Sequence, residues 1–204
     1  IVAQMPEEGA MFEEVDKSFR ALMGLIDVDA RVLSTAAKKG VLETVKDCNM
    51  KMDHINNGVN AYLEKKRLYF PRFFFLSNDE MLEILSETRD PLRVQPHLKK
   101  LFEGIHKLEF NEGMDILAMI SGEGEKVAMY DIISTADARG SVEKWLVQVE
   151  EQMKKSVRRD IENSIPNYHE AGRDTWVTKW PGQVVLCTGQ IFWTSEVHQA
   201  LRTG

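Results

Sequence analysis

Apolar residues recur at alternating steps of three and four along the first third of the chain. Such spacing predicts amphipathic helices that pack one face on a core. The first series contains Phe12, Val15, Phe19, Leu22 and Ile26. The second contains Val41, Val45, Cys48, Met52, Ile55, Val59 and Tyr62. It predicts a long helix from Val41 to Lys66 that would span roughly 35 Å at the usual helical rise.

A short aromatic segment follows this long helix. Pro71 cannot continue a helix, and the apolar run from Phe73 to Leu76 is expected to be buried. Ser77 and Glu80 have the spacing of a capping box, which predicts that a helix begins there. Pro96 then predicts the first residue of another helix that reaches Ile105.

The hydrophobic period changes from helical to two between His106 and Asp131. Leu108 and Phe110, then Ile116, Ala118 and Ile120, then Val127 and Met129 lie at every second position, which is typical of strands with one buried face. The glycines between Ser121 and Glu125 predict a tight turn. We therefore expect a small antiparallel hairpin or three-stranded sheet.

Helical patterning returns at Ser141, an expected N-cap, and continues to Ser164, shortly before Pro166. The last apolar stretch, after Pro181, predicts a helix that is buried on most sides. The whole pattern predicts a mainly α fold, an elongated helical bundle with residues 1–105 helical, 106–131 as a β-hairpin insertion and 132–204 helical. The candidate hinges, chosen only for the backbone freedom of glycine, are Gly104, Gly113 and Gly140.

Composition and charge exclude several functional classes. The 204 residues are 43% hydrophobic and carry a net charge of −6, so no general attraction for nucleic acid or anionic lipid is expected. No stretch approaches the about 20 apolar residues of a membrane-spanning helix. Cys48 and Cys187 are too far apart in sequence to form a redox motif, so we expect buried, reduced thiols. A start at Ile1 without an initiator methionine predicts an excerpt of a longer polypeptide.

Motifs for catalysis and for cofactors are missing from the sequence. It has no phosphate-binding GxxxxGK motif, no zinc spacing among its five histidines and no GxSxG nucleophile. Adjacent carboxylates such as Glu13 and Glu14 fit a solvated helix face better than acid–base chemistry. We predict no catalytic, cofactor-binding or metal site in this segment.

The segment from Lys65 to Phe75 combines cations with aromatic rings and could in principle stack on single-stranded nucleic acid. A buried aromatic run flanked by cations explains it better, because four consecutive apolar residues cannot share one stacking face. Burial of Phe73 to Phe75 would argue against the nucleic-acid interpretation. The expectation is no binding of nucleic acid and none of membrane.

Several stretches resemble the linker region of dynein heavy chains, and the resemblance covers nearly the whole chain in order. They are LEKKR at 63–67, FPRFFFLSNDE at 70–80, VQPHLKKLFEGI at 94–105, MISGEGEKV at 119–127 and WPGQVVLCTGQIFWTSEV at 180–197. The amino-acid sequence of the second stretch resembles axonemal heavy chains of cilia and flagella more than cytoplasmic ones.

The resemblance implies a mechanical lever that lies across a ring of AAA+ modules and bends as the ring binds and hydrolyses ATP. It implies a hairpin tip that contacts this ring, with the residues Ser121, Gly122, Glu123, Gly124, Glu125 and Lys126. It also marks a linker signature and core with the residues Phe70, Pro71, Arg72, Phe73, Phe74, Phe75 and Leu76.

The partners implied are the AAA+ ring of the same heavy chain and, through regions outside this segment, microtubules and the intermediate and light chains. ATP and Mg²⁺ would bind the ring and not this segment, so an ATPase activity would belong to the parent motor. The implied location is the cytoskeleton, on the cytoplasmic side, in a ciliary or flagellar axoneme. The competing interpretation is a standalone helical scaffold that binds other proteins.

Overall fold

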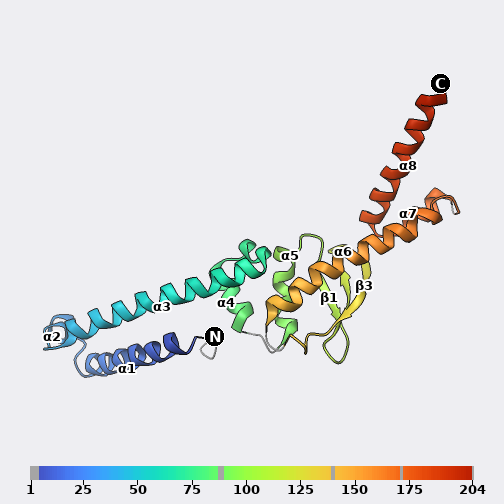
Figure 1. Ribbon diagram of the computed structural model, residues 1–204. Coiled ribbons are helices and arrows are strands. Elements are labelled where there is room, and N and C mark those ends of the chain that lie inside the picture. The colour runs from blue at the N-terminus through green and yellow to red at the C-terminus, as the bar shows by residue number, and fades with distance from the viewer. Residues whose placement is uncertain (1–4, 87–89, 139–140, 171, 204) are drawn as a thin grey trace. The chain divides into compact units, whose positions relative to one another are not determined.

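The computed structural model describes residues 5–86, 90–138, 141–170 and 172–203 (Figure 1). The chain divides into two compact units, Ile1–Pro71 and Arg72–Gly204. Among the described helices, none combines the length and the apolar character needed to cross a membrane.

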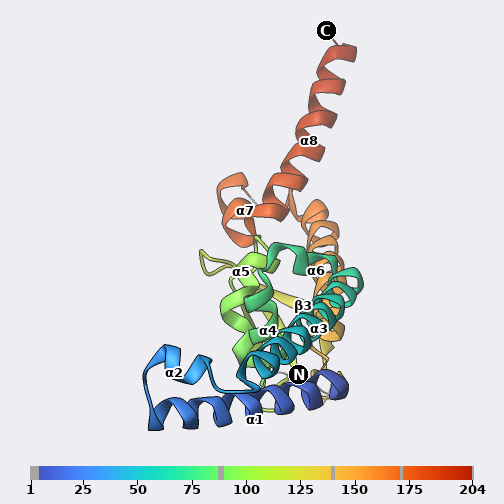
Figure 2. The same cartoon turned by 90° about the vertical axis from the view of Figure 1, so that its left-hand side faces the viewer.

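The first unit is a helical hairpin. Its long helices α1 (Pro6–Val28) and α3 (Val41–Tyr69) lie side by side in both views (Figures 1 and 2), joined by the short helix α2 (Val32–Ala36). Gly40 has a φ of 91° immediately before α3, a conformation that favours glycine. An ion pair of 2.9 Å between Glu14 and Lys51 connects the long helices. Both predicted helices are confirmed, whereas the pattern does not predict α2.

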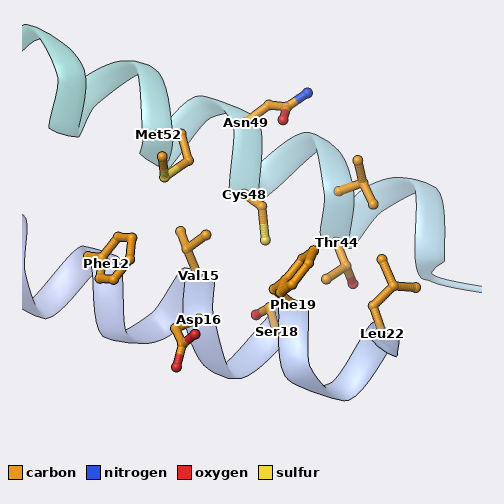
Figure 3. Close-up of a pocket in the computed structure, with 11 residues that line it drawn as sticks. Phe12, Val15, Asp16, Ser18, Phe19, Leu22, Thr44, Cys48, Asn49 and Met52 are labelled. Carbon is orange, nitrogen blue, oxygen red and sulfur yellow. The ribbon is translucent and has the colours of Figure 1, made fainter. Parts of the chain in front are cut away.

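An open groove of about 400 Å³ runs between α1 and α3. Val15 and Phe19 of α1 point toward Cys48 of α3, whereas Asp16 and Asn49 point away (Figure 3). The apolar stripes meet across the hairpin, but two helices alone cannot enclose them, and Phe19 remains 56% exposed. The first stripe was predicted to pack on a core, but it packs on the one neighbouring helix α3 and stays partly exposed.

After α3 the chain forms short helices, one antiparallel sheet and the long helices α6 and α8. They are the 3-10 helix η2 (Pro71–Phe75), α4 (Asn78–Ser86), the 3-10 helix η3 (Pro91–His97), α5 (Leu98–Leu101), β1 (Lys107–Phe110), β2 (Ile116–Ile120), β3 (Lys126–Ile133), α6 (Val142–Asn167), α7 (Arg173–Lys179) and α8 (Gly182–Thr203).

The aromatic run is only half buried, which corrects the prediction. Phe73 and Leu76 are buried, but Phe74 and Phe75 are 61% and 68% exposed. The cause is the 3-10 conformation of η2, which repeats every three residues and places every third side chain on one face. Phe70, three residues before Phe73, is buried as well.

The capping box at the start of α4 is confirmed. The Glu80 carboxylate accepts a hydrogen bond from the Ser77 backbone N–H at 3.0 Å, and the Ser77 hydroxyl accepts one from the Glu80 N–H at 3.3 Å. The helix expected from Pro96 to Ile105 is wrong in its extent. Pro96 lies inside η3, and the following α-helix ends at Leu101.

The predicted sheet is confirmed as three antiparallel strands in the order β1–β2–β3. Leu108, Ile116, Ala118 and Met129 are buried, as the alternation in the sequence predicts. The match is partial, because Met119 is buried out of phase and the predicted positions Phe110, Ile120 and Val127 are only half-buried. Helix α6 lies against β3 (Figure 1), and the buried apolar side chains of α6 are Val142, Trp145, Leu146 and Val149. The same helical spacing predicts that Met153 and Val157 face inward, and both are half-buried. Ser141 is at the N-cap position, although its side chain makes no capping hydrogen bond.

Helix α8 is exposed over most of its surface, so its predicted burial is wrong. Among its side chains only Val184 and Thr188 are buried, whereas Trp193 is 66% exposed. In Figure 2 the second half of α8 extends beyond α6 and α7. No described part of its own unit covers it there. The thiols of Cys48 and Cys187 are free, as predicted, but half-buried and not buried.

The candidate hinges have ordinary backbone conformations where they are described. Neither Gly104 nor Gly113 has a positive φ, so neither position requires glycine for its conformation. Gly140 lies outside the described residues. The division at residues 105 and 131 and the position of a hinge stay predictions.

Candidate functional site

The turn between β2 and β3 is held by its own backbone and by one hydroxyl. The Ser121 N–H donates to the carbonyl of Glu125 at 2.9 Å, and the Gly124 N–H donates to the carbonyl of Ser121 at 3.2 Å. Gly124 has a φ of 89°, the left-handed conformation that a three-residue hairpin connection needs. The Ser121 hydroxyl also accepts from the N–H groups of Glu123 and Glu125. The tip is therefore an ordered, exposed loop.

The charged side chains of the tip differ in what they contact. Lys126 forms an ion pair with Glu109 of β1. The Glu125 carboxylate accepts a hydrogen bond of 2.9 Å from the backbone N–H of Gly182, the first residue of α8. For the exposed Glu123 carboxylate, the described residues provide neither a hydrogen-bond donor nor an ion-pair partner. Glu123 is thus the acidic side chain that the tip presents outward.

The sheet that carries the tip is fastened to α6 along the outer edge of β3. The Ser156 hydroxyl accepts from the Tyr130 N–H at 2.8 Å and donates to the Gln152 carbonyl at 2.6 Å. The Gln152 side chain accepts from the Asp131 N–H at 3.1 Å and donates to its carboxylate. These bonds satisfy backbone groups that an edge strand would otherwise expose. The sheet behind the tip is therefore bonded directly to α6.

Arg72 of the aromatic segment connects three elements of the second unit. Its guanidinium donates to the Leu101 carbonyl at 3.0 Å, lies 4.9 Å from the centre of the Phe102 ring, and is 3.6 Å from the Glu150 carboxylate of α6. The pKa of Glu150 is lowered, first by the hydrogen bond from Lys154 and further by the charge of Arg72. This segment thus contains a structural junction, while the rings of Phe74 and Phe75 are exposed beside it.

The exposure of Phe74 and Phe75 bears on the nucleic-acid interpretation. The argument from burial fails for these two rings, because both exceed 60% exposure. That the chain does not bind nucleic acid therefore stays a prediction, as does the contact of the tip with a ring.

Metal-binding geometry is not found in the described part of the chain. Within residues 5–86, 90–138, 141–170 and 172–203, no group of three or more His, Cys, Asp and Glu side chains is arranged to hold a metal ion. The carboxylates of the tip can accept hydrogen bonds or pair with cations.

Sequence reasoning missed the residues that hold the tip in place. Gly182, Gln95 and Ser156 contact groups that lie 57, 13 and 26 positions away in sequence. No local pattern signals such pairs, because helical and strand periodicities relate only near neighbours. Within the tip itself, the serine and the two glycines were the correct signal for the turn.

A sequence model of the family described as "Dynein heavy chain, N-terminal region 2" matches residues 1–164 of the 204. The chain belongs to the dynein heavy chain family. Among its relatives, dynein axonemal heavy chain 12 of Rattus norvegicus is 57% identical over 204 residues, which are 100% of this chain and 7% of that protein.

Two further dynein heavy chains extend the comparison. Dynein axonemal heavy chain 3 of Homo sapiens is 55% identical over 201 residues, 98% of this chain and 5% of that protein. Dynein axonemal heavy chain 1 of Mus musculus is 42% identical over 204 residues, 100% of this chain and 5% of that protein. The predicted resemblance to axonemal dynein heavy chains is confirmed. The chain spans less than a tenth of the length of these relatives.

Proposed function

We propose that this dynein heavy chain segment is part of a mechanical linker that transmits conformational change from an ATP-hydrolysing AAA+ ring. ATP and Mg²⁺ bind in the ring, outside this segment, and the parent protein is a microtubule motor ATPase of the ciliary or flagellar axoneme. Its microtubules and its intermediate and light chains contact other regions. The ring of the same heavy chain is the direct partner of this segment.

This proposal rests on how the tip is held by the elements behind it. The tip presents Glu123 on an ordered turn, and the strand behind it is bonded to α6, a helix of 26 residues. A rigid helix fastened to a contact loop moves with that loop, as a lever requires. The tip is acidic, so we propose that it meets basic side chains of the ring.

The proposal is tested by replacing Glu123 with lysine in the parent heavy chain and measuring ATP-driven microtubule gliding and basal ATP turnover. Slower gliding with unchanged basal turnover is the expected result, because the substitution reverses the charge at the contact without reaching the nucleotide sites. Glu112→Lys is the matched control, since Glu112 is an exposed glutamate in the other turn of the same sheet. Equal effects of both substitutions, or of neither, would contradict the proposed contact.

A second candidate function, a helical scaffold that binds other proteins, is favoured by the open apolar groove between α1 and α3. Light scattering of the 204-residue chain distinguishes the two. A segment shaped to lie within a larger motor exposes apolar surface and is expected to self-associate. A monodisperse monomer at high concentration would favour the scaffold.

A further inference from the structure

Helix α8 begins without a capping residue of its own. Trp180 and Pro181 precede it, and neither side chain can accept a hydrogen bond from the first turn. The helical hydrogen bonds start with the Val185 N–H, which donates to the Pro181 carbonyl at 3.0 Å. The N–H groups of Gly182 and its two successors therefore need acceptors from elsewhere.

Glu125 of the hairpin tip supplies one such acceptor from 57 residues earlier in the chain. Its Oε1 accepts the Gly182 N–H at 2.9 Å. A carboxylate is favoured at this position because the helix N-terminus carries partial positive charge. A Cβ built on Gly182 would lie 3.4 Å from the same oxygen, at ordinary contact distance, so the carboxylate lies directly beside the start of α8.

The contact bridges a partly empty space. A cavity of about 110 Å³ lies at the base of α8, and its lining includes Ser121 and Glu125 of the tip and Pro181 and Val184 of the helix. That volume exceeds the roughly 30 Å³ share of one water molecule in liquid water. The hydrogen bond between Glu125 and Gly182 therefore links the tip to the helix beside this cavity.

Farther along its length, α8 is attached to the C-terminal part of α6 and to the residue that follows α6. The hydroxyls of Ser164 and Thr188 are 2.5 Å apart and buried, and the rings of Tyr168 and Phe192 stack with centres 4.0 Å apart. Helix α8 thus moves with α6 over its first half, while Glu125 joins its start to the tip.

We propose that Glu125 is a positioning residue that couples the hairpin tip to helix α8, leaving Glu123 as the carboxylate that meets a basic partner. The consequence for the motor rests on the proposed function: a partner that displaces the tip would pull on the start of α8. The two glutamates of the tip then have different roles, although they are two residues apart and both exposed.

The test is residue-specific amide hydrogen exchange, followed by NMR on the 204-residue chain. Glu125→Ala is expected to speed exchange of the Gly182 N–H about tenfold, the size of a typical helix-cap effect. Glu125→Gln keeps an oxygen acceptor but no charge, so a smaller increase is expected. Glu123→Ala is the matched control and should leave Gly182 unchanged. Unchanged exchange in Glu125→Ala would overturn the proposal.

A second variant approaches the contact from the helix side. Gly182→Val adds a branched side chain beside the Glu125 carboxylate, because a Cβ at this position already lies 3.4 Å from Oε1. The proposal therefore expects faster exchange in the first turn of α8. Helix propensity alone predicts the opposite, because valine favours helix more than glycine does. Amides of β3 and α6 with unchanged exchange show that each variant is folded. The measurement needs neither ring nor ATP, so it decides the role of Glu125 independently of the motor proposal.

Discussion

The side-chain amide of Gln95 exchanges two hydrogen bonds with the backbone of Leu108. Its Nε2 donates to the Leu108 carbonyl at 2.7 Å, and its Oε1 accepts from the Leu108 N–H at 2.9 Å. The glutamine of η3 thereby takes the place of a neighbouring strand beside β1. Together with Ser156 at β3, it closes both edges of the sheet at one position each with side chains.

Replacing Gln95 with alanine removes both partners of Leu108 at once. We expect the free energy of unfolding to fall by about 1–3 kcal/mol, because a half-buried N–H and carbonyl lose their hydrogen bonds. Urea unfolding followed by circular dichroism measures this change. Gln190→Ala, on the exposed surface of α8, is the matched control with an expected change near zero. Equal stabilities of the two variants would contradict the role of Gln95.

Ser156→Ala tests the attachment of β3 to α6. The Ser156 hydroxyl is fully buried and is the acceptor for the Tyr130 N–H. Its loss leaves that donor unpaired, so we expect a destabilisation of about 1–3 kcal/mol and faster hydrogen exchange at Tyr130. Ser86→Ala removes an exposed hydroxyl and serves as the control. A Tyr130 amide that stays protected in Ser156→Ala would refute this attachment.

The two halves of the aromatic run should respond differently to truncation. Phe73→Ala is expected to cost about 3–5 kcal/mol, because a fully buried ring leaves a cavity. Phe75→Ala should change the free energy of unfolding by less than about 0.5 kcal/mol in the isolated chain, as for most exposed positions. Thermal unfolding of both variants measures these changes in the free energy of unfolding. Similar losses at the two positions would mean that Phe75 is covered in solution.

Acid should weaken the start of α4 through Glu80. Its pKa is lowered from 4.5 to about 2, mainly by the hydrogen bond from Lys100 and next by the Ser77 N–H. A carboxylate whose pKa is lower in the folded state stabilises the fold above its ordinary pKa. That contribution declines as the pH falls from 4.5 to about 2.

The stability difference between the wild-type chain and Glu80→Gln isolates this contribution. We expect the wild-type advantage to be largest above pH 4.5 and to shrink on acidification toward pH 2, measured by urea unfolding across that range. An advantage that is constant with pH would refute the ion-pair assignment at Glu80.

Local order could be predicted from the sequence because near neighbours decide it. The extent of α3, the capping box of Ser77 and Glu80, and the turn at Gly124 each depend on residues within about four positions of one another. The strand alternation around Ala118 belongs to the same class. These features were predicted correctly, with boundaries shifted by a few residues.

The conformation of the aromatic run was harder to predict. Four consecutive apolar residues suggest burial of all four, since hydrophobicity alone favours it. The 3-10 helix that begins at Pro71 repeats every three residues, so Phe73 and Leu76 face inward and Phe74 and Phe75 do not. The sequence pattern did not specify this backbone conformation, which determines that Phe73 and Leu76 are the two buried side chains of the run.

By itself, the sequence determined the family, the main helices and the turn that forms the tip, because each follows from residue identity and short-range geometry. Tertiary structure alone decided which apolar faces are covered and what each charged side chain of the tip contacts. The apolar side chains of α8 favour burial, but they are buried only where another element packs against the helix. Glu125 and Gly182 lie 57 residues apart, and only the folded chain brings the carboxylate to the helix.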